Sequence, residues 1–97
     1  MFNLEIPLEI AKGLSNERCM EKDEARFECR FNKEVKPEDI VWVRDGVKLK
    51  DGDADGRIQI INDGVKQILV IKNAHLDDAG TYEIRVKDVK SVGILAV

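Results

Sequence analysis

The sequence has little of the chemistry on which small enzymes and metal sites depend. His75 is the only histidine, so no second imidazole is available for a metal cluster or a proton relay. The only serines, Ser15 and Ser91, lie outside any Gly-x-Ser-x-Gly motif, and neither cysteine lies in a recognisable nucleophile motif. A glycine-rich phosphate loop is missing as well. We therefore expect a protein that is not an enzyme and that uses no catalytic residue, cofactor or metal ion.

Long apolar runs and clusters of one charge are also missing. No run approaches the roughly 18 apolar residues that a membrane-spanning helix needs, and the first residues lack the basic and apolar regions of a secretory signal. Charged residues make up 36% of the chain, but both signs are scattered and the formal net charge is −3. Phosphate backbones and anionic lipids bind to basic stripes. We therefore expect neither nucleic acid nor a membrane as a partner.

Cysteine is scarce for a small secreted domain, because such domains commonly use several disulfides to supplement a limited core. Only Cys19 and Cys29 occur, and no asparagine is followed two places later by serine or threonine, as a glycosylation acceptor would be. Both absences favour a reducing, cytoplasmic location.

What the sequence does contain is a succession of short alternating segments. Apolar and polar residues alternate with a period of two, turn residues interrupt them about every ten positions, and no amphipathic stretch of helical period occurs. At 97 residues the chain can enclose one core, so we expect a single domain over residues 1–97. The pattern predicts an all-β fold with antiparallel strands in a sandwich or barrel.

The expected strands follow from this alternation. They are residues 4–10, an edge segment near 13–20, and then 25–30, 40–44, 57–61, 67–71, 81–87 and 92–97. The first contains Leu4, Ile6, Leu8 and Ile10 at period two, with Pro7 marking an edge or a break because proline cannot donate to a ladder. Asp45-Gly46 and Asn62-Asp63-Gly64 predict tight turns.

Certain residues form an ordered set with characteristic spacing. Cys29 is followed thirteen places later by Trp42, then by Leu69-x-Ile71, and then by Asp78-Ala79-Gly80-Thr81-Tyr82. This set resembles the immunoglobulin fold, with its B-strand cysteine, C-strand tryptophan, E-strand pair and F-strand tyrosine corner. Residues 42–47 and 95–97 resemble the intermediate (I-set) type found in intracellular muscle proteins such as titin, twitchin, obscurin and myosin-binding protein C.

The resemblance implies a two-sheet antiparallel sandwich with Greek-key connections. It also implies that the Tyr82 hydroxyl bonds to backbone a few residues upstream, and that Asp78 faces Arg57. The residues that the resemblance makes the structural core signature are Cys29, Trp42, Leu69, Ile71, Asp78, Gly80, Tyr82 and Ile84.

The sequence departs from the family pattern at informative places. Ile84 stands where extracellular members carry their second cysteine, so the inter-sheet disulfide cannot form and we expect no disulfide. Cys19 stands where a core-facing valine is usual, and Lys22 where a turn glycine is common. A bond between Cys19 and Cys29 stays an alternative because spacing alone cannot fix disulfide geometry, although the resemblance puts the two residues on separate strands that it does not register as neighbours.

Alternation also assigns the faces of the expected sheets. The side chains expected to point inward are those of Ala25, Phe27, Cys29, Ile40, Trp42, Ile58, Ile60, Leu69, Ile71, Ala74, Tyr82, Ile84, Leu95 and Val97. The outer faces then carry Val41, Val43, Ile94 and Ala96 on one sheet, and Ile61, Ile68 and Val70 on the other. Val41, Val43 and Ile94, rimmed by Arg44, Glu83 and Arg85, form the candidate protein-binding face. The alternative is that stems of long neighbours such as Arg85 cover the valines.

The resemblance implies a structural and protein–protein interaction module of a larger sarcomeric or cytoskeletal protein. Its partners would be sarcomeric or cytoskeletal proteins and neighbouring domains of its own chain, and the isolated domain would be monomeric. Two alternatives remain. One is an extracellular recognition domain of an adhesion protein or receptor. The other is a calcium-responsive domain, because Asp51-Gly52-Asp53-Ala54-Asp55-Gly56 matches the opening of a calcium loop, although its twelfth position holds Asn62 where the loop needs glutamate.

Overall fold

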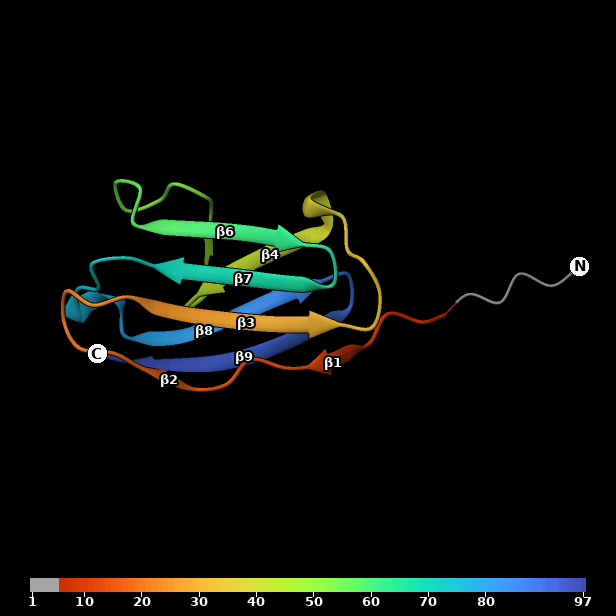
Figure 1. The fold of residues 1–97 in the computed structure, drawn as a ribbon, viewed down its shortest axis with the longest axis horizontal. Helices are drawn as coiled ribbons and strands as arrows, with labels where there is room; N and C mark the ends of the chain where they lie inside the picture. The colour runs from red at the N-terminus through yellow and green to blue at the C-terminus, as the bar shows by residue number, and fades with distance from the viewer. Residues whose placement is uncertain (1–5) are drawn as a thin grey trace, which may run out of the picture.

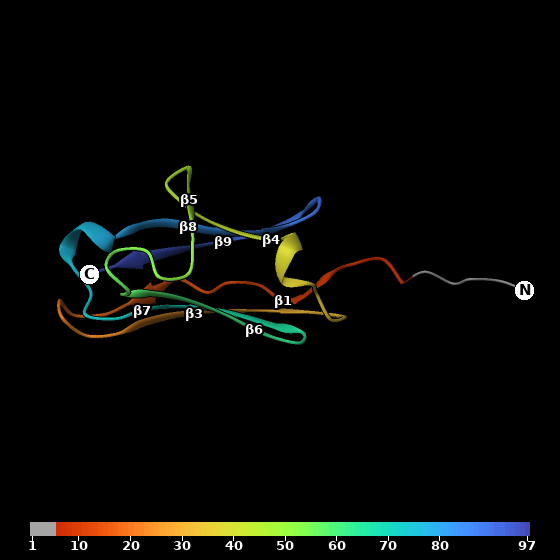
Figure 2. The same ribbon diagram turned by 90° about the horizontal axis from the view of Figure 1, so that it is seen from above.

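The described chain folds into two β-sheets packed face to face (Figures 1 and 2). The computed structural model describes residues 6–97, so Leu4 of the expected first strand lies outside the described residues. The strands are β1 (Ile10–Lys12), β2 (Glu17–Arg18), β3 (Ala25–Phe31), β4 (Ile40–Arg44), β5 (Val47–Leu49), β6 (Ile58–Asp63), β7 (Lys66–Ile71), β8 (Gly80–Val86) and β9 (Val89–Ala96). Two short 3-10 helices, η1 (Pro37–Asp39) and η2 (Leu76–Asp78), connect strands of different sheets. Among residues 6–97, no helix has the length and apolar character to cross a membrane.

The strand order confirms the two-sheet immunoglobulin-like sandwich. One sheet has the order β1-β3-β7-β6, and the other has the order β2-β9-β8-β4-β5. The chain crosses between the sheets several times, for example from β3 to β4 and from β7 to β8, as Greek-key connections require. All pairs are antiparallel except β2 and β9, which pair in parallel with Glu17 opposite Leu95. The expected antiparallel sandwich is therefore confirmed with one parallel pair at this edge, where the chain leaves β1 in one sheet and continues in the same direction along the other.

The first strand is shorter than expected and begins later. Residues 6–9 are not in a strand, and β1 covers only Ile10–Lys12, with a register shift between those two residues. Pro7 has no amide hydrogen to donate to a ladder, and the Asn32 side chain instead holds the backbone of residues 7–9 by hydrogen bonds. Its Nδ2 donates to the Pro7 carbonyl oxygen at 2.9 Å, and its Oδ1 accepts from the Glu9 amide at 2.9 Å.

The turns form where the sequence predicts them. Asp45 and Gly46 have φ values of 47° and 85° and join β4 to β5 as a two-residue hairpin, for which this dipeptide is suited. The second predicted turn joins β6 to β7, with Asp63 opposite Lys66. Lys22, at the position where glycine is common, has φ of 75°, a left-handed conformation that glycine adopts with less strain.

The core lies between the sheets and has the expected composition. Three of the side chains expected to point inward, Ile40, Ile60 and Val97, are only partly buried but pack against the core, and the others are buried. The core also includes Phe31 and Val86, which continue the alternation of β3 and β8. Gln67 is buried as well, because period two places it on the inner face of β7 with Leu69.

Candidate protein-binding face and tyrosine corner

The expected protein-binding residues lie on the outer face of the five-stranded sheet. In this sheet β4, β8 and β9 are neighbours, with Val43 opposite Glu83 and Glu83 opposite Val92. Trp42, Ile84 and Leu95 are buried between the sheets. Side chains alternate along a strand, so Val41 and Val43 on β4 and Ile94 on β9 face away from the core together.

Their exposure differs from the expectation. Ile94 is 51% exposed, but Val43 is only 3% exposed and Val41 is half-buried. Val43 pairs with Glu83 and Val41 with Arg85, and Arg85 Nε donates to Glu83 Oε2 above them. Long side chains can cover shorter apolar neighbours. The alternative that long neighbouring side chains cover the valines therefore holds for Val43, and Val43 does not contribute exposed surface to this face.

The exposed apolar centre of this face is on β9. Val92 is 46% exposed and lies two residues before Ile94, on the same side of the strand. The sequence reasoning missed Val92, although counting back by two from Ile94 would have found it. We call Val92 and Ile94 the β9 pair.

Arg44 does not belong to the rim of this face. Two residues after Trp42, it points to the inner side at the end of β4. Its Nη1 donates to the Asp77 carbonyl oxygen at 3.1 Å and lies 3.5 Å from Asp78 Oδ1. Arg44 is thus part of the tyrosine corner.

The outer face of the four-stranded sheet is covered in the same way. Ile68 and Val70 are each 5% exposed, and only Ile61 is open, at 41%. Glu28 stands opposite Ile68, and Arg26 stands opposite Val70. The two charged side chains approach each other to 3.7 Å. This face offers a smaller apolar surface than the β9 pair.

The contacts expected around Tyr82 are present. Tyr82 is fully buried, and its hydroxyl donates to the Asp78 carbonyl oxygen at 2.6 Å. The ring packs on Phe27, with a centroid distance of 5.0 Å. Burial raises the pKa of Tyr82, so the hydroxyl stays a donor at neutral pH.

Asp78 is 3% exposed, and its carboxylate joins several segments at this corner. Oδ2 accepts from Arg57 Nη1 at 2.7 Å and from the His75 backbone amide at 2.7 Å, which also fixes the start of η2. Burial alone would raise the pKa of Asp78. The hydrogen bonds from Arg57 and His75, together with the charge of Arg57, outweigh burial and lower this pKa below its usual value. The carboxylate therefore stays charged and joins Arg57, which directly precedes β6, to the start of η2 and to Arg44 at the end of β4.

Two aspartates of the calcium-like loop, Asp51 and Asp53, accept hydrogen bonds from backbone amides. Asp51 Oδ1 accepts from the Ile60 amide at 2.8 Å, and Asp53 Oδ2 accepts from the Lys50 amide at 2.8 Å. The Ile58 amide donates to the Asp53 carbonyl oxygen at 3.1 Å. Because β6 is the edge strand of its sheet, the bonds from the Ile58 and Ile60 amides cover edge groups that would otherwise attract another strand. Within residues 6–97, no group of three or more histidine, cysteine, aspartate or glutamate side chains is placed to hold a metal ion.

The two cysteines differ in their surroundings. Both are free thiols in the structure; Cys29 is fully buried and Cys19 is partly exposed. Burial raises the pKa of Cys29 to about 11. Burial, followed by the charges of Asp23 and Asp78, also raises the pKa of Cys19. Because the thiolate is the reactive form, both thiols are slow nucleophiles at neutral pH.

This difference predicts the result of a thiol titration. With a chromogenic disulfide reagent at neutral pH, the native protein should react slowly at Cys19 and leave Cys29 protected, whereas the denatured, unreduced protein should show both thiols. The Cys19→Ser variant is the control and should lose this slow reaction in the native state. Finding no free thiol in freshly purified, denatured monomer would contradict the expectation of no disulfide.

Comparison with known proteins gives the family. Residues 8–93 match the immunoglobulin I-set domain. The chain is 31% identical over all of its 97 residues to cardiac-type myosin-binding protein C of Mus musculus, of which it spans 7%. It is 34% identical over 86 residues, 84% of the chain, to the muscle M-line assembly protein unc-89 of Caenorhabditis elegans, of which it spans 1%. A crystal structure of the I9–I11 tandem from titin superposes with a TM-score of 0.84 at 28% identity, covering 95% of this chain and 33% of that one. The chain therefore belongs to the immunoglobulin I-set family.

Proposed function

We propose that this chain is a non-catalytic structural and protein–protein interaction module, one domain over residues 1–97, of a larger sarcomeric or cytoskeletal protein in the cytoplasm. The observation that carries the proposal is the full-length match to a small part of a muscle protein: the chain spans 7% of myosin-binding protein C. A match of this kind is what one repeat of a multidomain protein produces. Fold alone does not determine function, so the proposal needs a surface and a test.

The arrangement of the sandwich suits a module that links neighbours in line. The segment that leads into β1 lies at the end that also holds η1, and the C-terminus lies at the opposite end (Figure 1). A force applied through the two ends would run along the strands. Neighbouring domains of the same chain would then follow one another along the strand direction and leave the sheet faces free.

The free face that suits a partner best is the one with the β9 pair. Val92 and Ile94 are 46% and 51% exposed, and the ion pair of Glu83 and Arg85 lies beside them. An apolar centre with a charged border is typical of binding surfaces. We expect a protein partner to bury these two side chains.

The test replaces the β9 pair by threonine, which keeps the β-branched shape and adds polarity. The unchanged domain should capture sarcomeric proteins from muscle extract, as identified by mass spectrometry. The double variant Val92→Thr with Ile94→Thr should no longer capture them, while its thermal stability stays near normal. The matched control is Val47→Thr with Leu76→Thr, two exposed apolar residues away from β9. If both double variants capture the same proteins equally well, the partner does not bind at the β9 pair.

The location of the protein in cells distinguishes a cytoplasmic module from an extracellular recognition domain. An antibody against the domain should label sarcomeric or cytoskeletal structures in permeabilised muscle cells. Labelling of intact, unpermeabilised cells would favour the extracellular alternative.

A further inference from the structure

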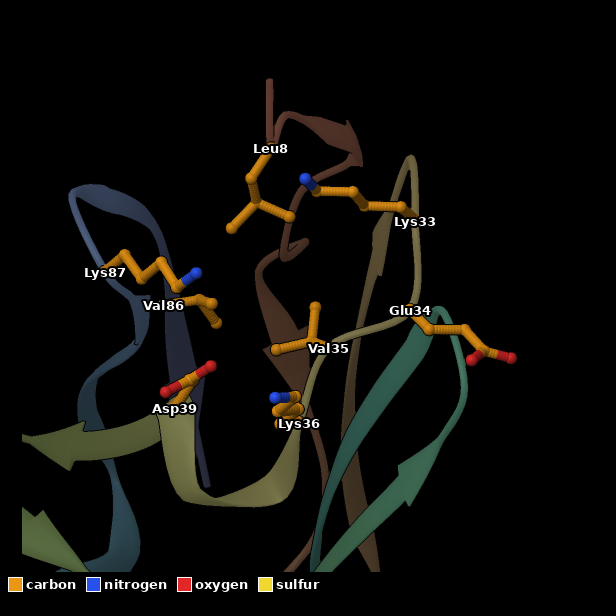
Figure 3. Close-up of a pocket in the computed structure, with 8 residues that line it drawn as sticks. All are labelled: Leu8, Lys33, Glu34, Val35, Lys36, Asp39, Val86 and Lys87. Carbon is orange, nitrogen blue, oxygen red and sulfur yellow. The ribbon is translucent and has the colours of Figure 1, made fainter. Parts of the chain in front are cut away.

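The end of the sandwich that holds η1 contains a small hollow. It encloses about 210 Å³ between the segment before β1, the loop from β3 to η1, and the turn from β8 to β9. Its lining residues are labelled in Figure 3, and they are Leu8, Lys33, Glu34, Val35, Lys36, Asp39, Val86 and Lys87.

The apolar part of this hollow is fixed in place. Val86 is the last residue of β8 and is 1% exposed, and Val35 is 8% exposed. The Val35 carbonyl oxygen accepts from Asn62 Nδ2 at 2.9 Å, and its amide donates to the Gly64 carbonyl oxygen at 3.4 Å. The floor therefore exists before any ligand arrives, which reduces the ordering cost of binding.

Lysines surround this floor. Lys33 Nζ donates to the Ile6 carbonyl oxygen at 2.7 Å, and the Lys36 carbonyl oxygen accepts from the Asp39 amide at 3.0 Å. Lys87 lies in the β8–β9 turn with φ of 56°. In Figure 3 the Lys33 and Lys87 side chains extend toward the hollow, whereas Glu34 points away.

The charge balance of the hollow is opposite to that of the chain. Among residues 6–97, none of the three lysines forms an ion pair. Asp39 is the one acidic lining residue that Figure 3 shows beside the hollow rather than pointing away. The site is therefore locally positive, although the formal net charge is −3. Unpaired ammonium groups beside an apolar floor suit a ligand that carries carboxylates and an apolar side chain together.

We propose that this hollow binds an acidic segment of a protein partner, with carboxylates on Lys36 and Lys87 and an apolar side chain against Leu8 and Val35. The inference rests on the proposed function because it assigns a second surface and a partner chemistry to the same binding module. A polyphosphate ligand fits less well, because it carries no apolar group and the apolar floor would stay unused. The volume suits one side chain of a peptide.

A synthetic peptide tests the site directly. The probe is a short fluorescein-labelled peptide with a central leucine flanked by aspartate and glutamate, and the control peptide has asparagine and glutamine instead. Fluorescence anisotropy at low salt should show binding of the acidic peptide only, and the binding should weaken as salt screens the charges. Backbone amide shifts in NMR should change in the loop from β3 to η1 and in the β8–β9 turn.

Charge-matched variants locate the binding. Lys36→Gln with Lys87→Asn should raise the Kd for the acidic peptide by at least about tenfold, which corresponds to about 1.4 kcal/mol of binding free energy. Asparagine is chosen at Lys87 because it tolerates a positive φ. Lys48→Gln with Lys72→Gln removes the same charge from exposed lysines elsewhere and should leave the Kd within about twofold of that of the unchanged domain.

Several results would overturn the proposal. They are equal affinity of both lysine variants, absence of binding at low salt, or amide shifts that map to another surface. Equal binding of inorganic phosphate or of phosphatidylserine vesicles would identify a phosphate site, and protein-concentration-dependent self-association would identify a second copy as the occupant. Because the probe is synthetic, its failure leaves the capture of sarcomeric proteins through the β9 pair unaffected. If the peptide binds but the β9-pair variant captures the same proteins as the unchanged domain, the result would reject the binding face at the β9 pair and leave the hollow supported.

Discussion

Replacing Asp78 by alanine is expected to destabilise the domain by about 3–5 kcal/mol, because removing one partner of a buried ion pair leaves the other charge uncompensated. Arg57 is the residue left behind; its side chain is 17% exposed, and it lies 2.7 Å from the carboxylate. The His75 amide loses its acceptor in the same variant. Chemical denaturation, analysed as the free energy of unfolding, measures the loss.

Removing both charges separates the ion pair from the packing. Asp78→Ala combined with Arg57→Met should cost less than the sum of the single changes, because the Arg57 charge is removed together with its partner. Asp78→Asn should cost less than Asp78→Ala, since the amide oxygen can still accept from the His75 amide. A loss below about 1 kcal/mol in Asp78→Ala would show that the corner does not depend on this carboxylate.

The same group predicts a dependence of stability on pH. Hydrogen bonds and the Arg57 charge lower the pKa of Asp78 in the folded state despite its burial, whereas an unfolded aspartate titrates near about 3.9. A lowered folded pKa gives stability that is complete above the unfolded pKa and is lost as pH falls through the folded one. Unfolding measured from neutral pH to below about 4 should therefore show a steeper loss for the unchanged domain than for Asp78→Asn.

Removing the Tyr82 hydroxyl is expected to cost about 1–3 kcal/mol, because the Asp78 carbonyl oxygen would lose a buried donor. The bond is 2.6 Å long and Tyr82 is fully buried. Tyr82→Phe keeps the ring and its contact with Phe27, so chemical denaturation should report the hydrogen bond alone. A change within error of zero would mean that the hydroxyl does not brace the corner.

A Tyr→Phe change at an exposed position cannot serve as the control, because Tyr82 is the only tyrosine. Thr81→Val serves instead, since Thr81 is the exposed neighbour on β8 and the variant also removes one hydroxyl. It should change stability by less than about 0.5 kcal/mol. A loss equal to that of Tyr82→Phe would point to a general effect on β8.

Much of this fold could be predicted from the sequence because the relevant signals are local. Asp45-Gly46 forms the predicted turn since its φ preferences are properties of two residues. Period two placed Phe27, Cys29 and Tyr82 in the core correctly, because a strand alternates its side chains wherever it lies. The contact of Asp78 with Arg57 was expected through the family resemblance and not from the local pattern.

Other features were decided only when the sheets came together. Alternation places Val43 on the outer face, but its burial depends on Glu83 and Arg85 from another strand. The parallel pairing of β2 with β9 likewise joins residues far apart in sequence. The lysines of the hollow come from two segments far apart in sequence, and no local pattern relates Lys36 to Lys87. The sequence by itself determined which side of each strand faces inward, because that depends on neighbouring residues; tertiary structure decided which outward side chains stay exposed, because that depends on what packs beside them.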